Sequence, residues 1–170
     1  LFHIENELRK EFPQINMQAI ICDIADKMRV EEIFENYKPQ IVIHAAAHKH
    51  VPLMEINPGE SIKNNVVGTQ IVADAAHNYG AANFVMISTD KAVNPTSLMG
   101  SSKRIAEMYI QDLNRTSQTH FVTVRFGNVL GSNGSVVPLF KKQIADGGPV
   151  TVTHPEMKRY FMTIPEASQL

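Results

Sequence analysis

The 170-residue chain has few of the features that define several classes of protein. It has no tryptophan and only one cysteine, Cys22. A single cysteine cannot form an internal disulfide, which fits a protein of a reducing compartment. No apolar stretch approaches the roughly 20 residues that cross a bilayer, and no signal peptide is visible. The formal net charge is −1 and there is no dense basic run, so we expect no nucleic-acid partner.

The sequence alternates short apolar runs with longer helical patterns. The apolar runs predict strands at 17–23, 40–46, 83–89 and 120–129. Apolar spacing and capping residues predict helices at 1–11, 26–37, 58–79 and 97–115. Strands that alternate with long helices predict an α/β fold with a doubly wound parallel sheet, covered on both faces. After residue 131 the elements become shorter and are broken by Gly and Pro.

Small and polar residues gather where the predicted strands end. They are Asp23, then Ala45-Ala46-Ala47-His48-Lys49, then Ser88-Thr89-Asp90-Lys91, then Gly127-Asn128-Val129. Open parallel sheets bind ligands outside the carboxyl ends of their strands, so the sequence predicts a ligand site at this edge. We predict no metal there, because His48-Lys49-His50 has no acidic or cysteine partner nearby in sequence.

Blocks of sequence along essentially the whole chain carry a family resemblance. They are "VIHAAAHKHVPLME", "NNVVGT", "STDKAVNPT", "KRIAEMY", "RFGNVLGSNGSVVPLF" and "RYFMTI". In this order and spacing they resemble the extended short-chain dehydrogenase/reductases. More closely, they resemble the nucleotide-sugar 4,6-dehydratases of bacterial polysaccharide biosynthesis that act on UDP-N-acetylglucosamine.

The resemblance implies a Rossmann-like fold, a UDP-sugar substrate, a homo-oligomer, and NAD, rather than NADP, as a cofactor that is bound and regenerated. Residues 1–130 would be a partial NAD-binding domain with the catalytic residues, and 131–170 the start of the part that binds the nucleotide sugar. The family's glycine-rich turn for the dinucleotide pyrophosphate does not occur in this sequence. Aligned by element, the first strand, first helix and second strand are absent.

We therefore expect the chain to be a piece of a longer protein. The sub-branch that it resembles consists of long, membrane-anchored dehydratases. This implies a cytoplasmic catalytic part, anchored to the bacterial inner membrane by a region upstream of this sequence. The segment itself is expected to make no membrane contact.

The resemblance assigns catalytic roles around the third predicted strand. Asp90 would be the acid at the departing 6-hydroxyl, Lys91 the base at carbon 5, and Thr89 a hydrogen-bonding partner of the 4-hydroxyl. Lys103 would bind the nicotinamide ribose; in the superfamily it also lowers the pKa of a tyrosine. That tyrosine position holds Met99, which has no exchangeable proton. Asp90, Lys91 or a water held by Thr89 would then take the 4-hydroxyl proton.

Other residues match the family's cofactor and substrate contacts. Cofactor contacts are expected from Asp23, Ile24, Ala45, Ala46, Ala47 and Lys103. Substrate contacts are expected from Lys49, Asn65, Asn128, Val136 and Arg159. An arginine suits a diphosphate because its planar fork binds two oxygens at once.

Two alternatives to a 4,6-dehydratase stay open. A UDP-sugar 4-epimerase would keep the tyrosine and would not need Thr89-Asp90-Lys91. A nucleotide-sugar-binding module without catalysis is favoured by Met99 and by the missing glycine-rich turn. It is opposed by the intact set of Asp90, Lys91 and Lys103. The preferred hypothesis is a dehydratase that makes a UDP-4-keto-6-deoxy-N-acetylhexosamine from UDP-N-acetylglucosamine.

Overall fold

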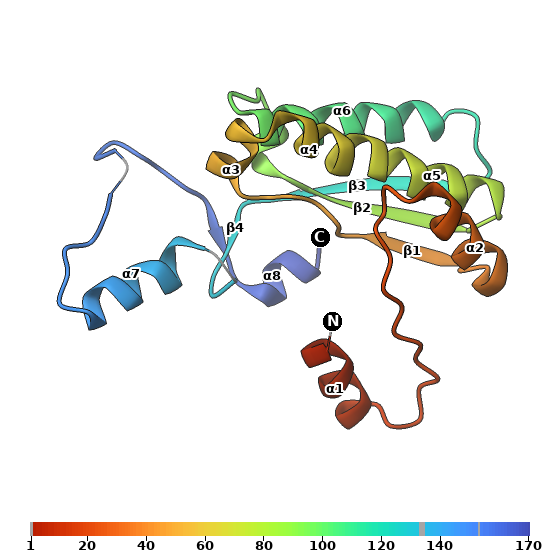
Figure 1. Ribbon diagram of the computed structural model, residues 1–170, viewed down its shortest axis with the longest axis horizontal. Helices are drawn as coiled ribbons and strands as arrows, with labels where there is room; N and C mark the ends of the chain where they lie inside the picture. The colour runs from red at the N-terminus through yellow and green to blue at the C-terminus, as the bar shows by residue number, and fades with distance from the viewer. Residues whose placement is uncertain (1, 133–134, 153) are drawn as a thin grey trace.

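The structure, a computed structural model, describes residues 2–132, 135–152 and 154–170. A three-stranded parallel sheet in the order β1-β2-β3 forms its centre (Figure 1). The strands of this sheet are β1 (Ile41–His44), β2 (Asn83–Thr89) and β3 (His120–Phe126). A separate parallel pair joins β4 (Asn128–Val129) and β5 (Phe161–Met162). The α/β class and the parallel sheet predicted from the sequence are confirmed.

The helices of the main body cover one face of this sheet (Figure 1). They are α2 (Lys27–Tyr37), α3 (Val51–Ile56), α4 (Pro58–Ile62), the π-helical segment η1 (Lys63–Gly68), α5 (Thr69–Asn78) and α6 (Leu98–Leu113). The core lies between helices and sheet, where Phe84 and Met86 of β2 are fully buried together with Ala73, Ala76 and Ile110. Burying a side chain as large as Phe84 contributes about 1.5–3 kcal/mol to stability.

Local signals explain several helix boundaries. Asp26 caps α2 by accepting a hydrogen bond from the Arg29 amide, as its place before the apolar pattern predicts. Ser97 caps α6 in the same way through the Gly100 amide. The long helix predicted at 58–79 is present as α4, η1 and α5 in succession. The short helix α3, which precedes it, was not predicted.

The strand predicted at 17–23 is wrong. This segment is extended but unpaired, and its Ile21 side chain is 88% exposed, while Cys22 is only partly buried against the core. A strand exists only within a hydrogen-bonded ladder, and none of the described strands runs beside this segment. Ile41 and Ile43 of β1 are largely exposed because they lie on the sheet face opposite the buried His44, which the described helices of the main body leave uncovered. The predicted cover on both faces of the sheet is thus not found for this strand.

The strand predicted at 120–129 is interrupted. It divides into β3 and β4 at Gly127, where the backbone packs closely against Tyr160, the residue before β5. A Cβ atom on Gly127 would lie 2.7 Å from the Tyr160 carbonyl oxygen, so this approach requires glycine. The remaining helices are α7 (Val136–Ala145) and α8 (Ile164–Ser168), with η2 (Asp90–Ala92) a single 3₁₀ turn after β2.

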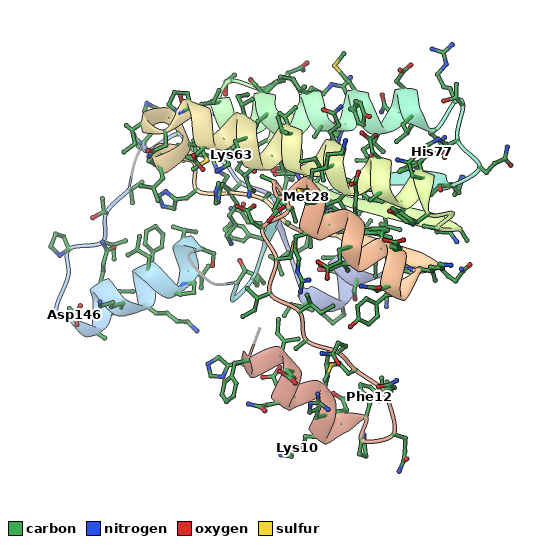
Figure 2. All side chains as sticks on the ribbon, turned by 45° about the vertical axis from the view of Figure 1, so that its right-hand side comes forward. Lys10, Phe12, Met28, Lys63, His77 and Asp146 are labelled. Atoms are coloured by element: carbon green, nitrogen blue, oxygen red, sulfur yellow. The ribbon has the colours of Figure 1, made fainter. Side chains whose placement is uncertain are left out.

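Helix α1 (Phe2–Glu11), predicted at 1–11, is present but stands apart from the main body. Figures 1 and 2 both show it separated from the sheet, with Lys10 and Phe12 labelled at its far end in Figure 2. It has no buried residue. Within the part of the chain that the structure describes, no helix combines the length and apolar character needed to cross a membrane.

Candidate functional site

A pocket of about 530 Å³ lies at the carboxyl ends of the three main strands, the edge that the sequence predicts. Most of the predicted site residues line it: Ala45, Ala47, Lys49, Thr89, Lys91, Met99, Lys103, Asn128 and Val136. They come from the segment after β1, the end of β2 with the turn η2, the strand β4, the first two turns of α6 and the start of α7. The topology therefore brings together residues that are up to 91 positions apart in the chain (45 to 136).

The turn η2 after β2 holds a compact set of hydrogen bonds. Lys91 Nζ donates to Asp90 Oδ1 at 3.0 Å and to Asn128 Oδ1 at 3.3 Å. Thr89 Oγ1 donates to the same Asp90 oxygen at 3.0 Å and accepts from the Lys91 amide at 3.3 Å. The side chains of Asp90 and Lys91 are each 30% exposed. Lys91 and Thr89 line the pocket, whereas Asp90 does not and joins its wall only through its hydrogen bonds to these two residues. The Lys91 amine and the Thr89 hydroxyl thus both bind one carboxylate oxygen, Asp90 Oδ1.

Gly100 lets helix α6 pack directly against this turn. A Cβ atom at Gly100 would lie 2.3 Å from the carbonyl oxygen of Lys91, closer than non-bonded atoms can approach. This role of Gly100 was not predicted from the sequence. The only signal was a small residue beside Met99 in the first turn of the predicted helix. The glycine therefore fixes how close α6 comes to the Asp90–Lys91 pair.

Helix α6 contributes two buried residues to the pocket, one turn apart. Met99 and Lys103 are each only 4% exposed. Lys103 Nζ donates to the Ile87 carbonyl oxygen at 2.8 Å. Burial lowers the pKa of Lys103 to about 8, and the negative charge of Glu107 opposes this shift. A cation therefore lies on the pocket wall beside a thioether that cannot exchange a proton.

Asn65 lies behind the pocket instead of on its wall. It is fully buried within η1, and its Oδ1 accepts from the His48 amide at 2.8 Å. Its Nδ2 donates to the His48 carbonyl at 3.1 Å and to Ser102 Oγ at 3.0 Å. Asn65 holds a structural position here, with its amide groups bonded to other protein atoms, and its contact with the substrate stays a prediction. The amide ties the loop after β1 to α6.

Besides Asn65, four predicted contact residues do not line the pocket. Asp23 accepts from the Ala25 amide at 2.9 Å, and Ile24 packs against the hydrophobic core. Ala46 is absent from the lining, and the exposed Arg159 donates to the Lys158 carbonyl. Their roles toward cofactor and diphosphate stay predictions. Among the residues that the structure describes, no group of three or more His, Cys, Asp or Glu side chains could hold a metal ion.

A buried histidine beneath the pocket was missed from the sequence. His44, at the end of β1, shares a 2.9 Å hydrogen bond with Thr69 Oγ1. Burial lowers the pKa of His44 to about 4, with the positive charge of Lys103 as the second cause. The imidazole is therefore neutral at pH 7. The signal was a polar residue inside the apolar run "IVIHAA".

Similarity to known proteins extends over the whole chain. The family described as "Polysaccharide biosynthesis protein" matches residues 1–170. The capsular polysaccharide biosynthesis protein CapD of Staphylococcus aureus is 60% identical over 172 residues, which are 100% of this chain and 29% of CapD. A UDP-N-acetylglucosamine 4,6-dehydratase (inverting) of Campylobacter jejuni is 40% identical over 162 residues, 93% of this chain and 48% of that protein. The chain therefore spans less than half the length of both relatives.

Solved structures share the fold. Pen from Bacillus thuringiensis has a TM-score of 0.90 at 39% identity, covering 99% of this chain and 53% of Pen. DesIV, a dTDP-glucose 4,6-dehydratase of Streptomyces venezuelae solved with NAD and TYD bound, has a TM-score of 0.86 at 20% identity, covering 97% and 56%, which shows the fold alone. The match of the family model over residues 1–170 shows that the chain belongs to the polysaccharide biosynthesis protein family.

Proposed function

We propose that the full-length protein is a nucleotide-sugar 4,6-dehydratase. Its reaction would convert UDP-N-acetylglucosamine to a UDP-4-keto-6-deoxy-N-acetylhexosamine for polysaccharide synthesis. The observation that carries the proposal is the 3.0 Å contact of Lys91 Nζ with Asp90 Oδ1 at the edge of the pocket. The Campylobacter relative named for this reaction supports the choice of substrate.

The inner part of the pocket fits the nicotinamide half of NAD. Ala45 and Ala47 at the end of β1 leave room for a flat ring near the backbone, and the buried ammonium of Lys103 can donate to ribose hydroxyls. When bound, NAD would take up hydride from carbon 4 of the sugar and return it to carbon 6. The protein's own residues then have only protons to move.

Asp90 and Lys91 balance those protons in one cycle. The cycle starts with Asp90 as carboxylate and Lys91 as neutral amine. Asp90 receives the proton of the 4-hydroxyl as the 4-ketone forms, and Lys91 then takes the proton from carbon 5. The carbon 5–carbon 6 double bond forms as Asp90 gives its proton to the departing 6-hydroxyl, which leaves as water. Lys91 finally returns its proton to carbon 5, and both groups are as they began.

The hydrogen bonds of the turn suit this cycle. The structure holds Asp90 and Lys91 as an ion pair at 3.0 Å, so Lys91 must give one proton to solvent before it can act as the carbon 5 base. Thr89 Oγ1 reaches the same Asp90 oxygen at 3.0 Å, so the threonine hydroxyl can pass the 4-hydroxyl proton to the carboxylate. Residue 99 therefore need not carry a proton, and a methionine there is compatible with activity.

The outer part of the pocket would hold the nucleotide sugar. Asn128 accepts from Lys91 at 3.3 Å and reaches the pocket from β4. Lys49 and Val136 line it from the loop after β1 and the start of α7. A cation, an amide and an apolar side chain suit a diphosphate, sugar hydroxyls and a ring face respectively.

The test is to incubate the full-length protein with NAD and UDP-N-acetylglucosamine and to analyse the products by mass spectrometry. The expected product has lost one water. An isomer of unchanged mass would indicate a 4-epimerase instead. Binding of the UDP-sugar without any conversion, with every UDP-N-acetylhexosamine tried, would indicate a binding module and refute the proposal.

A further inference from the structure

One carboxylate is buried deep behind the Asp90–Lys91 turn. Glu107 of α6 is fully buried and accepts from Ser88 Oγ at 2.6 Å, from Arg125 Nε at 2.8 Å and from Arg125 Nη2 at 2.5 Å. Arg104 Nη1 adds a fourth hydrogen bond at 3.1 Å. Burial alone would raise the pKa of Glu107, but hydrogen bonds from Arg125, Ser88 and Arg104 lower it overall. The group is therefore ionised at neutral pH, in the interior, with every oxygen satisfied.

This carboxylate joins three elements just behind the reacting groups. Ser88 on β2 directly precedes Thr89, and it lies opposite Arg125 in the β2–β3 register. Arg125 in turn stands three residues before Asn128, the hydrogen-bond acceptor of Lys91 Nζ. Glu107 itself is one helical turn beyond Lys103. The ends of β2 and β3 are thus fixed to one point in the middle of α6.

The arrangement is more elaborate than packing requires. Replacing a buried ion pair by apolar residues of similar volume is often neutral or stabilising, so burying a carboxylate between two guanidinium groups adds little stability by itself. What it adds is directional restraint, because the Arg125 fork and the Ser88 hydroxyl define the position of the carboxylate from two strands. The strand end so restrained is the one that carries Thr89 and Asp90.

We propose that Glu107 is a positioning residue for the reaction, acting through Ser88 and Arg125 on the turn at 89–91. The inference rests on the proposed dehydratase function, for which this turn supplies the acid and the base. Glu107 does not line the pocket, so its effect is on the placement of Asp90 and Lys91 and not on binding of the substrate.

The experiment compares Glu107→Gln with Asp74→Asn in the full-length protein. Asp74 is a matched control, because its half-buried carboxylate accepts a hydrogen bond from Tyr109 and links α5 to α6 away from the pocket. For Glu107→Gln we expect kcat to fall about 10²-fold with little change in KM, as for a misplaced reacting group. For Asp74→Asn we expect a loss of stability with kcat nearly unchanged.

Hydrogen–deuterium exchange of the backbone amides at 88–92 provides a second readout that does not need turnover. Glu107→Gln should speed exchange in this segment, Ser88→Ala should reproduce part of the increase, and Asp74→Asn should leave it at the wild-type rate. If exchange at 88–92 is the same in Glu107→Gln as in Asp74→Asn, the positioning role is refuted. If the wild-type protein converts no UDP-sugar, the proposed function fails, and the exchange comparison still decides whether Glu107 restrains the turn at 89–91.

Discussion

The buried imidazole of His44 makes the stability of this protein sensitive to mild acid. Burial lowers its pKa from 6.5 in the unfolded chain to about 4 in the folded protein. The unfolded state therefore binds more protons than the folded state between these two values. Stability attributable to the neutral imidazole is complete above pH 6.5 and is lost as the pH falls toward 4.

The size of the effect follows from these two pKa values. Between pH 7 and pH 5 the unfolded imidazole becomes almost fully protonated, while the folded one stays almost fully neutral. Linkage then gives a loss of about 2 kcal/mol in the free energy of unfolding from this one residue. Only part of this depends on the nearby charge, because burial is the larger cause and Lys103 the smaller.

The assay is urea denaturation of the wild-type protein and of His44→Asn at pH 7 and at pH 5. Asparagine keeps a polar group for Thr69 but has no proton to gain in this range. The His44→Asn variant should be less stable at pH 7, yet it should lose about 2 kcal/mol less than the wild type on going to pH 5. The comparison of the two differences removes the effect of all other titrating groups. Equal losses in the two proteins would show that His44 is not held neutral by burial.

Three further substitutions test the site. Lys91→Ala should lower turnover by about 10²–10⁴-fold, because it removes the carbon 5 base, while UDP binding measured by calorimetry stays within about twofold; surviving turnover would show that another group is the base. Gly100→Ala should displace the Lys91 carbonyl, which its Cβ would meet at 2.3 Å, and reduce kcat, whereas Gly59→Ala, with no atom within 4 Å of the added Cβ, should not. Lys103→Met should weaken NAD binding in a fluorescence titration and raise the denaturation midpoint; unchanged NAD affinity would remove Lys103 from the cofactor site.

The sequence predicts the part of the site that depends on residues close together in the chain. Thr89, Asp90 and Lys91 follow an apolar run, and a strand end in a parallel sheet already specifies which edge they occupy. The caps of α2 and α6 are likewise local, since each is formed by a polar side chain and an amide three residues later. Such features need no knowledge of the rest of the molecule.

The features that the sequence analysis missed depend on partners distant in the chain. Asn65 bonds Ser102 across 37 positions, and His44 bonds Thr69 across 25, so neither burial nor role is visible from neighbours in sequence. The strand prediction at 17–23 was wrong because a pairing partner is lacking in the part of the chain that the structure describes. Its composition suits a strand, but pairing depends on a neighbour that the described residues do not provide.

Lys103 bears on whether Met99 marks a site without activity. In the superfamily that the sequence resembles, this lysine lowers the pKa of a tyrosine. Met99 stands at the tyrosine position, so Lys103 has no phenol to act on. The Lys103 ammonium is nevertheless buried, and its pKa falls from 10.5 to about 8. This shift lowers the free energy of unfolding by about 3 kcal/mol at neutral pH, and the loss is relieved only as the pH rises from 8 toward 10.5. An apolar side chain would fill the same space at lower cost. A buried cation on a pocket wall, maintained without a phenol to tune, is better explained by a ligand that it binds.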